Sequence, residues 1–251
     1  MPSTPRLLTI PISHFCEKAR GALDRAGVAY AEEPHLQFFH MLAARRAGGG
    51  RTVPVLVTDA GVLRDSTDIL EWADARTPAE RRLYPVGADG DEARRIEAWL
   101  DEGLGPDGRL WMYHETLPVA KGMRRWALAG VPVWERRAFA GFGWALEPGI
   151  RRYLGVDAAA ATVALARTDA VFDEVAGLLA DGRPFLTGAR FTAADLTFAA
   201  LSAALLVPPQ YGSPLPQPAD LPAAMATEIE RLRAHPAGAF AARLYHDERR
   251  A

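Results

Sequence analysis

The chain has very little cysteine and very little lysine. Its 251 residues include one cysteine, Cys16, which excludes an internal disulfide and any metal site built from several cysteines. Lysine occurs only at Lys18 and Lys121, so arginine carries nearly all of the positive charge, a bias typical of a GC-rich genome. The formal net charge of -2 argues against a general attraction to nucleic acid or to an anionic membrane.

Long apolar runs are also missing. No uninterrupted apolar stretch approaches the length needed to span a membrane. Residues 1–5 lack a basic region followed by an apolar one, so no signal peptide is expected. The composition, 49% hydrophobic and 24% charged, is ordinary for a globular protein with a buried core. Together with the lone cysteine, these features predict a cytoplasmic protein.

The first part of the chain alternates short apolar runs with amphipathic segments. The order predicts βαβ followed by αββα, with a hairpin turn at Asp59-Ala60-Gly61. Ser66 is the expected N-cap of the third helix. The expected strands are 6–10, 28–32, 55–58 and 62–64, and the expected helices are 15–26, 38–47 and 66–75.

The rest of the chain has a helical pattern. A stretch rich in proline, glycine and charge predicts a linker at 81–90 between an α/β domain (1–80) and an all-helical domain (91–251). The first helix of the second domain is expected to be interrupted at Gly105-Pro106. Helices are expected at 91–104, 133–145, 158–180, 192–206 and 223–234.

Ser13-His14-Phe15-Cys16 is the motif that bears most directly on chemistry. It places a hydroxyl and the only thiol three residues apart, at a predicted strand-to-helix turn. A helix start offers free N–H groups and a positive dipole end, which favour an anion and hold a sulfur more easily as thiolate. The thiolate is either that of Cys16 or that of a bound thiol cofactor.

Two further motifs lie in the same region. Val53-Pro54 opens an apolar strand, where a proline marks a sheet edge, a cis bond or a simple trans turn. Asp65-Ser66 precedes a helix whose start suits a bound carboxylate, and a plain N-cap explains the same residues.

Together, these three motifs resemble the N-terminal domain of the cytosolic glutathione S-transferases, of the bacterial type with a Ser-x-x-Cys tetrad. Phe191-Thr192-Ala193-Ala194-Asp195-Leu196 combines a capping box with a hydrophobic staple and resembles the start of that family's core helix. The resemblance covers essentially the whole chain. It implies a thioredoxin-like α/β domain with a mixed four-stranded sheet, followed by an all-α domain.

The resemblance also implies a glutathione site, with glutathione as co-substrate. The backbone of Val53, before a cis Pro54, would bind the cysteinyl part. The Asp65 and Ser66 pair would hold the γ-glutamyl end. The glycyl carboxylate needs a cation or donor, for which the candidates are His40 and Arg51, with Arg45 behind them.

Ser13 occupies the first tetrad position, which is catalytic in the family. A hydrogen bond from its hydroxyl would stabilise the glutathione thiolate and lower the pKa of the thiol. Cys16 is then structural or auxiliary. The alternatives are a Cys16-based thiol transferase or glutathione-dependent reductase, a non-catalytic binding module, and an enzyme that uses another low-molecular-weight thiol.

The remaining expectations concern the histidines and the second substrate. His14 is expected to be exposed, and it is either inert or supplies a proton or a substrate contact near the sulfur. The spacing of His14, His35 and His40 predicts no metal site. The resemblance implies a homodimer that acts in detoxification on a small apolar electrophile bound between the domains. The candidates for that pocket are a subset of Trp111, Met112, Tyr113, His114, Trp126, Trp134, Phe139, Phe142 and Trp144.

Overall fold

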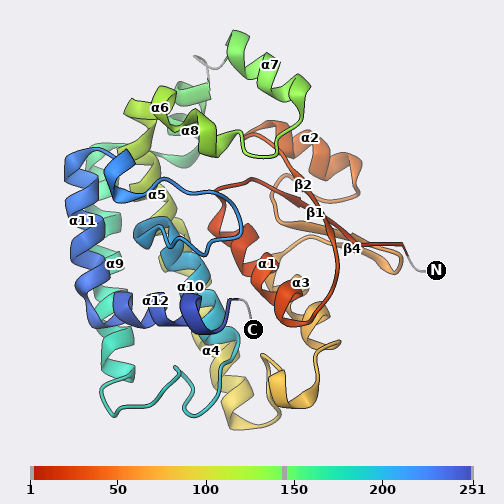
Figure 1. Ribbon diagram of the computed structural model, residues 1–251, viewed down its shortest axis with the longest axis vertical. Helices are drawn as coiled ribbons and strands as arrows, with labels where there is room; N and C mark the ends of the chain where they lie inside the picture. Colours follow the sequence, from red (N-terminus) through yellow and green to blue (C-terminus); the bar gives the residue numbers. More distant parts are fainter. Residues whose placement is uncertain (1–2, 143–145, 250–251) are drawn as a thin grey trace.

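The computed structural model describes residues 3–142 and 146–249 and places a small sheet beside a large group of helices (Figure 1). The sheet has the strand order β2-β1-β3-β4. β1 pairs with β2 in parallel and with β3 antiparallel, and β3 pairs with β4 antiparallel. The expected mixed four-stranded sheet is therefore confirmed. Its strands are β1 (Arg6–Thr9), β2 (Ala31–Pro34), β3 (Val55–Thr58) and β4 (Gly61–Leu63).

Both faces of the sheet are covered, which explains why its central strands are apolar at successive positions. Leu7 and Leu56 belong to the main core on the side of α1 and α3. Their neighbours Leu8 and Val55 point to the other face and pack with Ala44 of α2. This alternation follows from the two-residue period of a strand. The three helices are α1 (His14–Arg25), α2 (Phe39–Arg46) and α3 (Ser66–Asp74).

The rest of the described chain is helical, and α10 lies at its centre. Every residue of α10 is buried, and it packs against α1, α4, α5 and α12. None of the described helices combines the length and apolar character needed to cross a bilayer. The helices are α4 (Ala88–Glu102), α5 (Leu104–Thr116), α6 (Ala120–Ala127), α7 (Val133–Phe142), α8 (Leu146–Leu154), α9 (Ala158–Leu178), α10 (Ala193–Leu206), α11 (Ala223–Ala234) and α12 (Pro236–Asp247).

Several predicted boundaries are wrong for local reasons. β2 begins three residues later than expected, because Gly27 ends α1 at φ 65° and the Val28 amide still bonds to the Leu23 carbonyl. The break between α4 and α5 is at Gly103, so the expected break at Gly105 lies inside α5. The sequence patterns also missed α6, α8 and α12, and residues 143–145 of the expected helix 133–145 lie outside the described residues.

The predicted capping box at the start of α10 is confirmed. Asp195 accepts a hydrogen bond from the Thr192 amide at 2.8 Å, so the carboxylate covers the first donors of the helix. Its second oxygen accepts from the Leu186 amide, also at 2.8 Å. One carboxylate therefore fixes both the helix start and the loop that leads to it.

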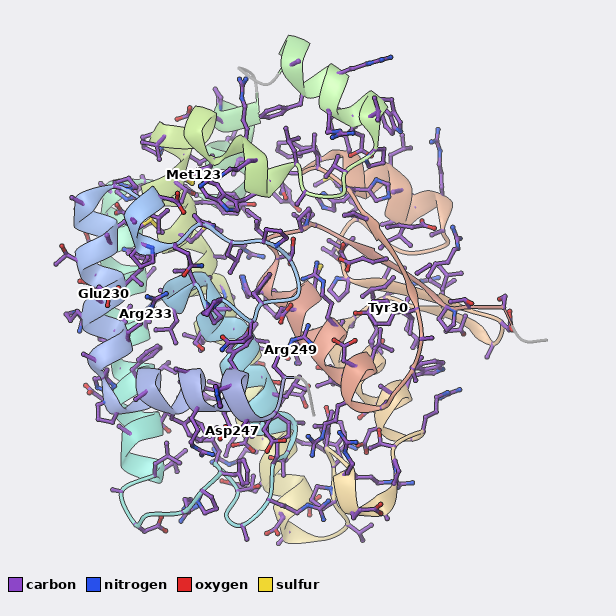
Figure 2. All side chains as sticks on the ribbon, viewed as in Figure 1. Tyr30, Met123, Glu230, Arg233, Asp247 and Arg249 are labelled. Carbon is purple, nitrogen blue, oxygen red and sulfur yellow. The ribbon has the colours of Figure 1, made fainter. Side chains whose placement is uncertain are left out.

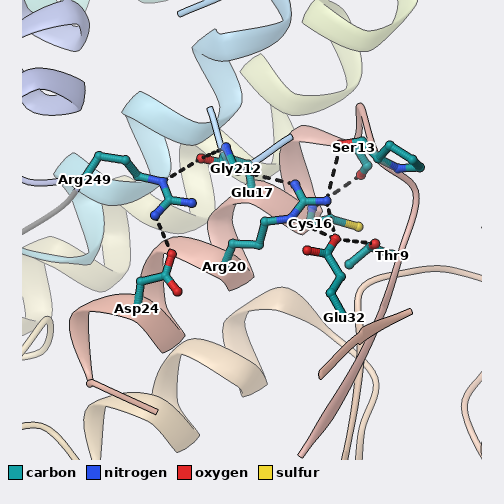
Figure 3. A network of polar contacts seen from close by, with 10 residues as sticks. Thr9, Ser13, Cys16, Glu17, Arg20, Asp24, Glu32, Gly212 and Arg249 are labelled. Carbon is teal, nitrogen blue, oxygen red and sulfur yellow. Dashed lines mark hydrogen bonds and ion pairs between the residues drawn. The ribbon is translucent and has the colours of Figure 1, made fainter. Parts of the chain in front are cut away.

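Two buried ion networks join α1 to the helical part of the molecule. The ammonium of Lys18 lies 2.7 Å from Glu97 and 2.5 Å from Asp101, both on α4, and donates to the Thr67 hydroxyl of α3. On the preceding residue of α1, Glu17 contacts the Arg20 and Arg249 guanidinium groups and accepts from the Gly212 amide (Figure 3). The helix that carries the Ser13 motif is thus held by contacts from distant parts of the chain.

Candidate active site

Ser13 lies where the sequence motif predicts, at the turn between β1 and α1. Its backbone is extended, and its hydroxyl oxygen accepts a hydrogen bond of 3.4 Å from the Cys16 amide. Ser13 is therefore the N-cap of α1. Because the oxygen serves as acceptor, the hydroxyl hydrogen remains available to a group in front of the helix.

A cleft of about 330 Å³ opens beside this helix start. Its walls come from the β1–α1 turn, the segment around α2, α5 and the end of α8. No Asp or Glu lines the cleft in the described part of the chain. The lining residues are Ile10, Ile12, Ser13, His14, Phe15, Gln37, His40, Arg51, Thr52, Val53, Arg109, Met112, Tyr113, Tyr153 and Leu154.

Cys16 points away from this cleft into the protein. Its side chain is 0% exposed and does not line the cleft. Burial raises the pKa of the thiol, against the opposing effects of the Arg20 guanidinium and of hydrogen bonding to Ser13. A buried thiol that resists ionisation is poorly suited to act as a nucleophile.

Val53 lines the cleft, and the peptide bond between Val53 and Pro54 is cis. Pro54 itself is buried behind this edge of the cleft. Asp65 and Ser66 lie at the start of α3 and outside the cleft lining. The cap of α3 differs from the expectation: Asp65, not Ser66, is the N-cap and accepts from the Thr67 amide at 2.8 Å.

The two cation candidates for a glycyl carboxylate, His40 and Arg51, both line the cleft and differ in charge. Burial lowers the pKa of His40, so its imidazole is neutral, and its Nδ1 accepts from the Phe38 amide at 3.1 Å. Arg51 is exposed, and no carboxylate in the described chain pairs with it. Arg45 is exposed on α2 and does not line the cleft.

His14 is buried, not exposed as predicted. Its Nε2 lies 3.0 Å from the carbonyl oxygen of Gly105, to which it donates. Burial, and secondly the Arg109 guanidinium, lower the pKa of His14 to about 3. Its neighbour Phe15 packs so closely on α5 that a Cβ at Gly105 would lie 2.5 Å from the ring. Both contacts place α5 against the first turn of α1.

A small apolar pocket of about 70 Å³ adjoins the cleft and shares Ile12 and Met112 with it. Met123, labelled on α6 in Figure 2, and Trp126 also line it. Its full lining is Ile12, Met112, Thr116, Met123, Trp126, Ala127, Ala203, Ala204, Val207, Tyr211, Leu215, Pro216 and Met225.

These linings show which of the candidates named from the sequence for the second-substrate pocket border the cleft or the apolar pocket. Met112 and Tyr113 line the cleft and Trp126 lines the apolar pocket, whereas Trp111 is part of the main core. Trp134 is exposed on α7 and contacts Phe39 edge-on. The side chains of Phe142 and Trp144 lie outside the described part of the structure.

Sequence reasoning missed Arg109 and the α8 residues Tyr153 and Leu154. Arg109 was detectable in principle, because it lies three and four residues before Met112 and Tyr113 on the same helix face. Among residues 3–142 and 146–249, no group of three or more His, Cys, Asp or Glu side chains is arranged to hold a metal ion.

Comparisons with known proteins agree with this fold. Residues 7–81 match the family model of the glutathione S-transferase N-terminal domain. No curated protein matches the sequence significantly. A glutathione S-transferase from Methylobacterium radiotolerans, solved with glutathione sulfonate, superposes with a TM-score of 0.56 at 23% identity, over 96% of this chain and 95% of that one.

Two further solved structures cover nearly the whole chain. The theta-class glutathione S-transferase of Xanthomonas axonopodis pv. citri, with glutathione bound, has a TM-score of 0.56 at 22% identity, over 95% of this chain and 96% of that one. A glutathione transferase of Phanerochaete chrysosporium has a TM-score of 0.62 at 16% identity, over 98% and 97%. The chain therefore has the fold of the glutathione S-transferases, and its sheet region matches their N-terminal domain.

Proposed function

We propose that this protein is a glutathione S-transferase in which Ser13 activates the thiol of bound glutathione. The observation that carries the proposal is the different position of Ser13 and Cys16, which lie within one turn at the start of α1. Ser13 lines the cleft with a free hydroxyl hydrogen, whereas Cys16 is fully buried and burial raises its thiol pKa. A hydroxyl that donates to a thiolate at a helix start favours the charged form of the thiol.

Glutathione would lie along the N-terminal wall of the cleft and extend beyond its lining to the start of α3. The backbone of Val53 would bind its cysteinyl part, and Asp65 and Ser66 its γ-glutamyl end. Arg51 would pair with the glycyl carboxylate, since it is the charged member of the two candidates and His40 is neutral. Arg51→Gln should therefore raise the KM for glutathione about tenfold and change kcat little, because a binding contact alone is lost.

The chemical step would be attack of the glutathione sulfur on an apolar electrophile. A carbon–sulfur bond forms while a leaving group departs with its electron pair or a π bond opens, and the thiol proton goes to solvent. The cleft and the adjoining pocket, which is lined by Met112, Met123 and Met225, support an apolar second substrate. Methionines adapt readily to the shape of such a ligand.

The test compares Ser13→Ala with Cys16→Ala, using glutathione and 1-chloro-2,4-dinitrobenzene. We expect Ser13→Ala to lower kcat/KM about 10- to 100-fold, the effect of one hydrogen bond to a charged sulfur. It should also shift the pH–rate profile to higher pH. Cys16→Ala should stay within about threefold of the natural protein, since the thiol has no role in the reaction.

Ser13→Thr is the control for folding, since it retains both the cap and the hydroxyl and should recover most of the activity. Loss of activity in Cys16→Ala alone would indicate a Cys16-based thiol transferase or reductase instead. Binding of glutathione without turnover on a panel of electrophiles would indicate a binding module. No binding of glutathione, with binding of another small thiol, would indicate a different co-substrate.

The organisation of the whole protein remains part of the proposal. We propose a glutathione-binding domain at residues 1–80, a linker at 81–90 and a helical domain at 91–251. A homodimer, a cytoplasmic location and a role in detoxification stay predictions.

A further inference from the structure

Arg109 is a charged residue in the cleft to which the proposed function gives no task. It lies on α5, is half-buried and lines the cleft. In the described part of the chain no carboxylate pairs with it, and residues 1–2, 143–145 and 250–251 contain no Asp or Glu. By contrast, Asp107, two residues earlier on α5, lies 3.8 Å from Arg167. A half-buried guanidinium without an anion is available to bind one.

The surroundings of Arg109 make its charge effective. The described lining of the cleft contains no Asp or Glu, and burial keeps His14 and His40 neutral by lowering their pKa values. The fixed charges in the lining are therefore those of Arg51 and Arg109. Because Arg51 is taken up by the glycyl carboxylate in the proposed function, Arg109 remains for a different anionic group.

Arg109 is also close to the reacting end of the cleft. Its guanidinium helps to lower the pKa of His14, the residue next to Ser13, and opposes the rise that burial causes in the pKa of Tyr113. Arg109, Met112 and Thr116 follow one another at i, i+3 and i+7, so they lie on one face of α5. That face leads from the charged group in the cleft to the apolar pocket, which Met112 and Thr116 line.

We propose that Arg109 binds a carboxylate of the second substrate, so that the electrophile is an amphipathic acid with an apolar part and one carboxylate. The planar guanidinium suits a carboxylate, with which it forms two parallel hydrogen bonds. The apolar part packs on Met112 and the adjoining pocket. This inference rests on the proposed function, because it takes glutathione to occupy the other side of the cleft.

The experiment measures calorimetric dissociation constants for two thioether conjugates, S-(4-carboxybenzyl)glutathione and S-(4-methylbenzyl)glutathione. They differ in the carboxylate alone, and neither carries a thiol. We expect the natural protein to bind the carboxylate conjugate about tenfold or more tightly than the methyl conjugate. Arg109→Gln should abolish this preference, and Arg109→Lys should retain part of it.

Arg137→Gln is the matched control, because Arg137 is exposed on α7 and does not line the cleft. It makes the same change of net charge and should leave the preference intact. Equal affinity of both conjugates for the natural protein, or a preference that survives in Arg109→Gln, would overturn the inference while glutathione binding stands. If the natural protein binds neither of the two conjugates and does not bind glutathione, the proposed function and this inference are overturned together.

Discussion

At the scale of single residues, His14 shows how burial changes the role of a side chain. The imidazole is enclosed between α1 and α5 and donates to the Gly105 carbonyl, and burial lowers its pKa to about 3. In the unfolded chain the same group takes up a proton below its ordinary pKa of 6.5. Falling pH therefore stabilises the unfolded chain relative to the native one.

We predict that the free energy of unfolding decreases as the pH falls from about 7.5 towards 4 because of His14. At about pH 5.5 the loss from this residue is about 1 kcal/mol relative to neutral pH. Urea unfolding at several pH values, in the natural protein and in His14→Gln, measures the difference. Gln keeps a donor for the Gly105 carbonyl but binds no proton, so its stability should fall less steeply.

Comparing the natural protein with His14→Gln also removes the contributions of the other titratable groups, which both proteins share. Burial raises the pKa of Asp195 to about 6, which alters stability in the same pH range and in the opposite direction. That contribution is the same with and without His14 and cancels in the difference. Identical pH slopes in both proteins would show that His14 titrates normally in the folded state.

The active-site residues differ in how well the sequence predicted them. Ser13 was named from a local motif, since local geometry is enough to put a serine at a helix start. The cis bond between Val53 and Pro54 was expected from the resemblance to the family. The environments of Cys16 and His14 depend on which face of α1 meets α10 and α5. That packing is decided by residues about ninety or more positions away, so a local pattern does not contain it.

At the scale of helices and loops, Glu135 holds α7 to the segment before α2. Its side chain is fully buried, and its two oxygens accept from the His35 ring at 2.6 Å and from the Leu36 amide at 2.8 Å. A second contact, the edge-on packing of Phe39 and Trp134, reinforces this connection. α7 is thereby tied to the element that carries His40.

We predict that Glu135→Ala lowers the free energy of unfolding by about 2 kcal/mol, because it leaves the buried Leu36 amide without a partner. Exchange of that amide with solvent should also become faster, as hydrogen-exchange mass spectrometry would detect. The control is Glu147→Ala, which removes a half-exposed pair with Arg151 on α8 and should cost less than about 0.5 kcal/mol. Equal losses in both variants would contradict the role given to Glu135.

The helices were predicted best where periodicity and a capping residue agree. α10, with its Thr192–Asp195 capping box, and α11 were found to within a residue. α6 and α8 are only 8 and 9 residues long, and no side chain caps the start of α6. Such short helices depend on contacts with the rest of the protein more than on their own sequence, since a single turn of helix is costly to start.

At the scale of the whole molecule, Glu17 connects three distant segments. Its buried carboxylate contacts Arg20 on α1, the Gly212 amide in the proline-rich loop and Arg249 after α12 (Figure 3). Figure 2 places Arg249 near the end of α12, beside α1. The same loop supplies Tyr211, Leu215 and Pro216 to the apolar pocket.

We predict that Glu17→Gln destabilises the protein by about 3 kcal/mol, because two arginines lose a buried counter-charge. Chemical denaturation should show this as a lower midpoint. Glu92→Gln, which removes a surface pair with Arg95, should change the free energy of unfolding by less than about 1 kcal/mol. A Glu17→Gln protein as stable as this control would mean that the network is dispensable.

The sequence by itself determined the order of strands and helices in the first part, the helical second part and the position of Ser13 at a helix start. These depend on apolar periodicity, capping residues and turns, which act over a few neighbouring positions. Only the tertiary structure decided that Cys16 is buried, that His14 is buried and neutral, and that Arg109 shares a cleft with Arg51. Burial and pairing of charge depend on which distant segments meet, and these determine the chemistry of the site.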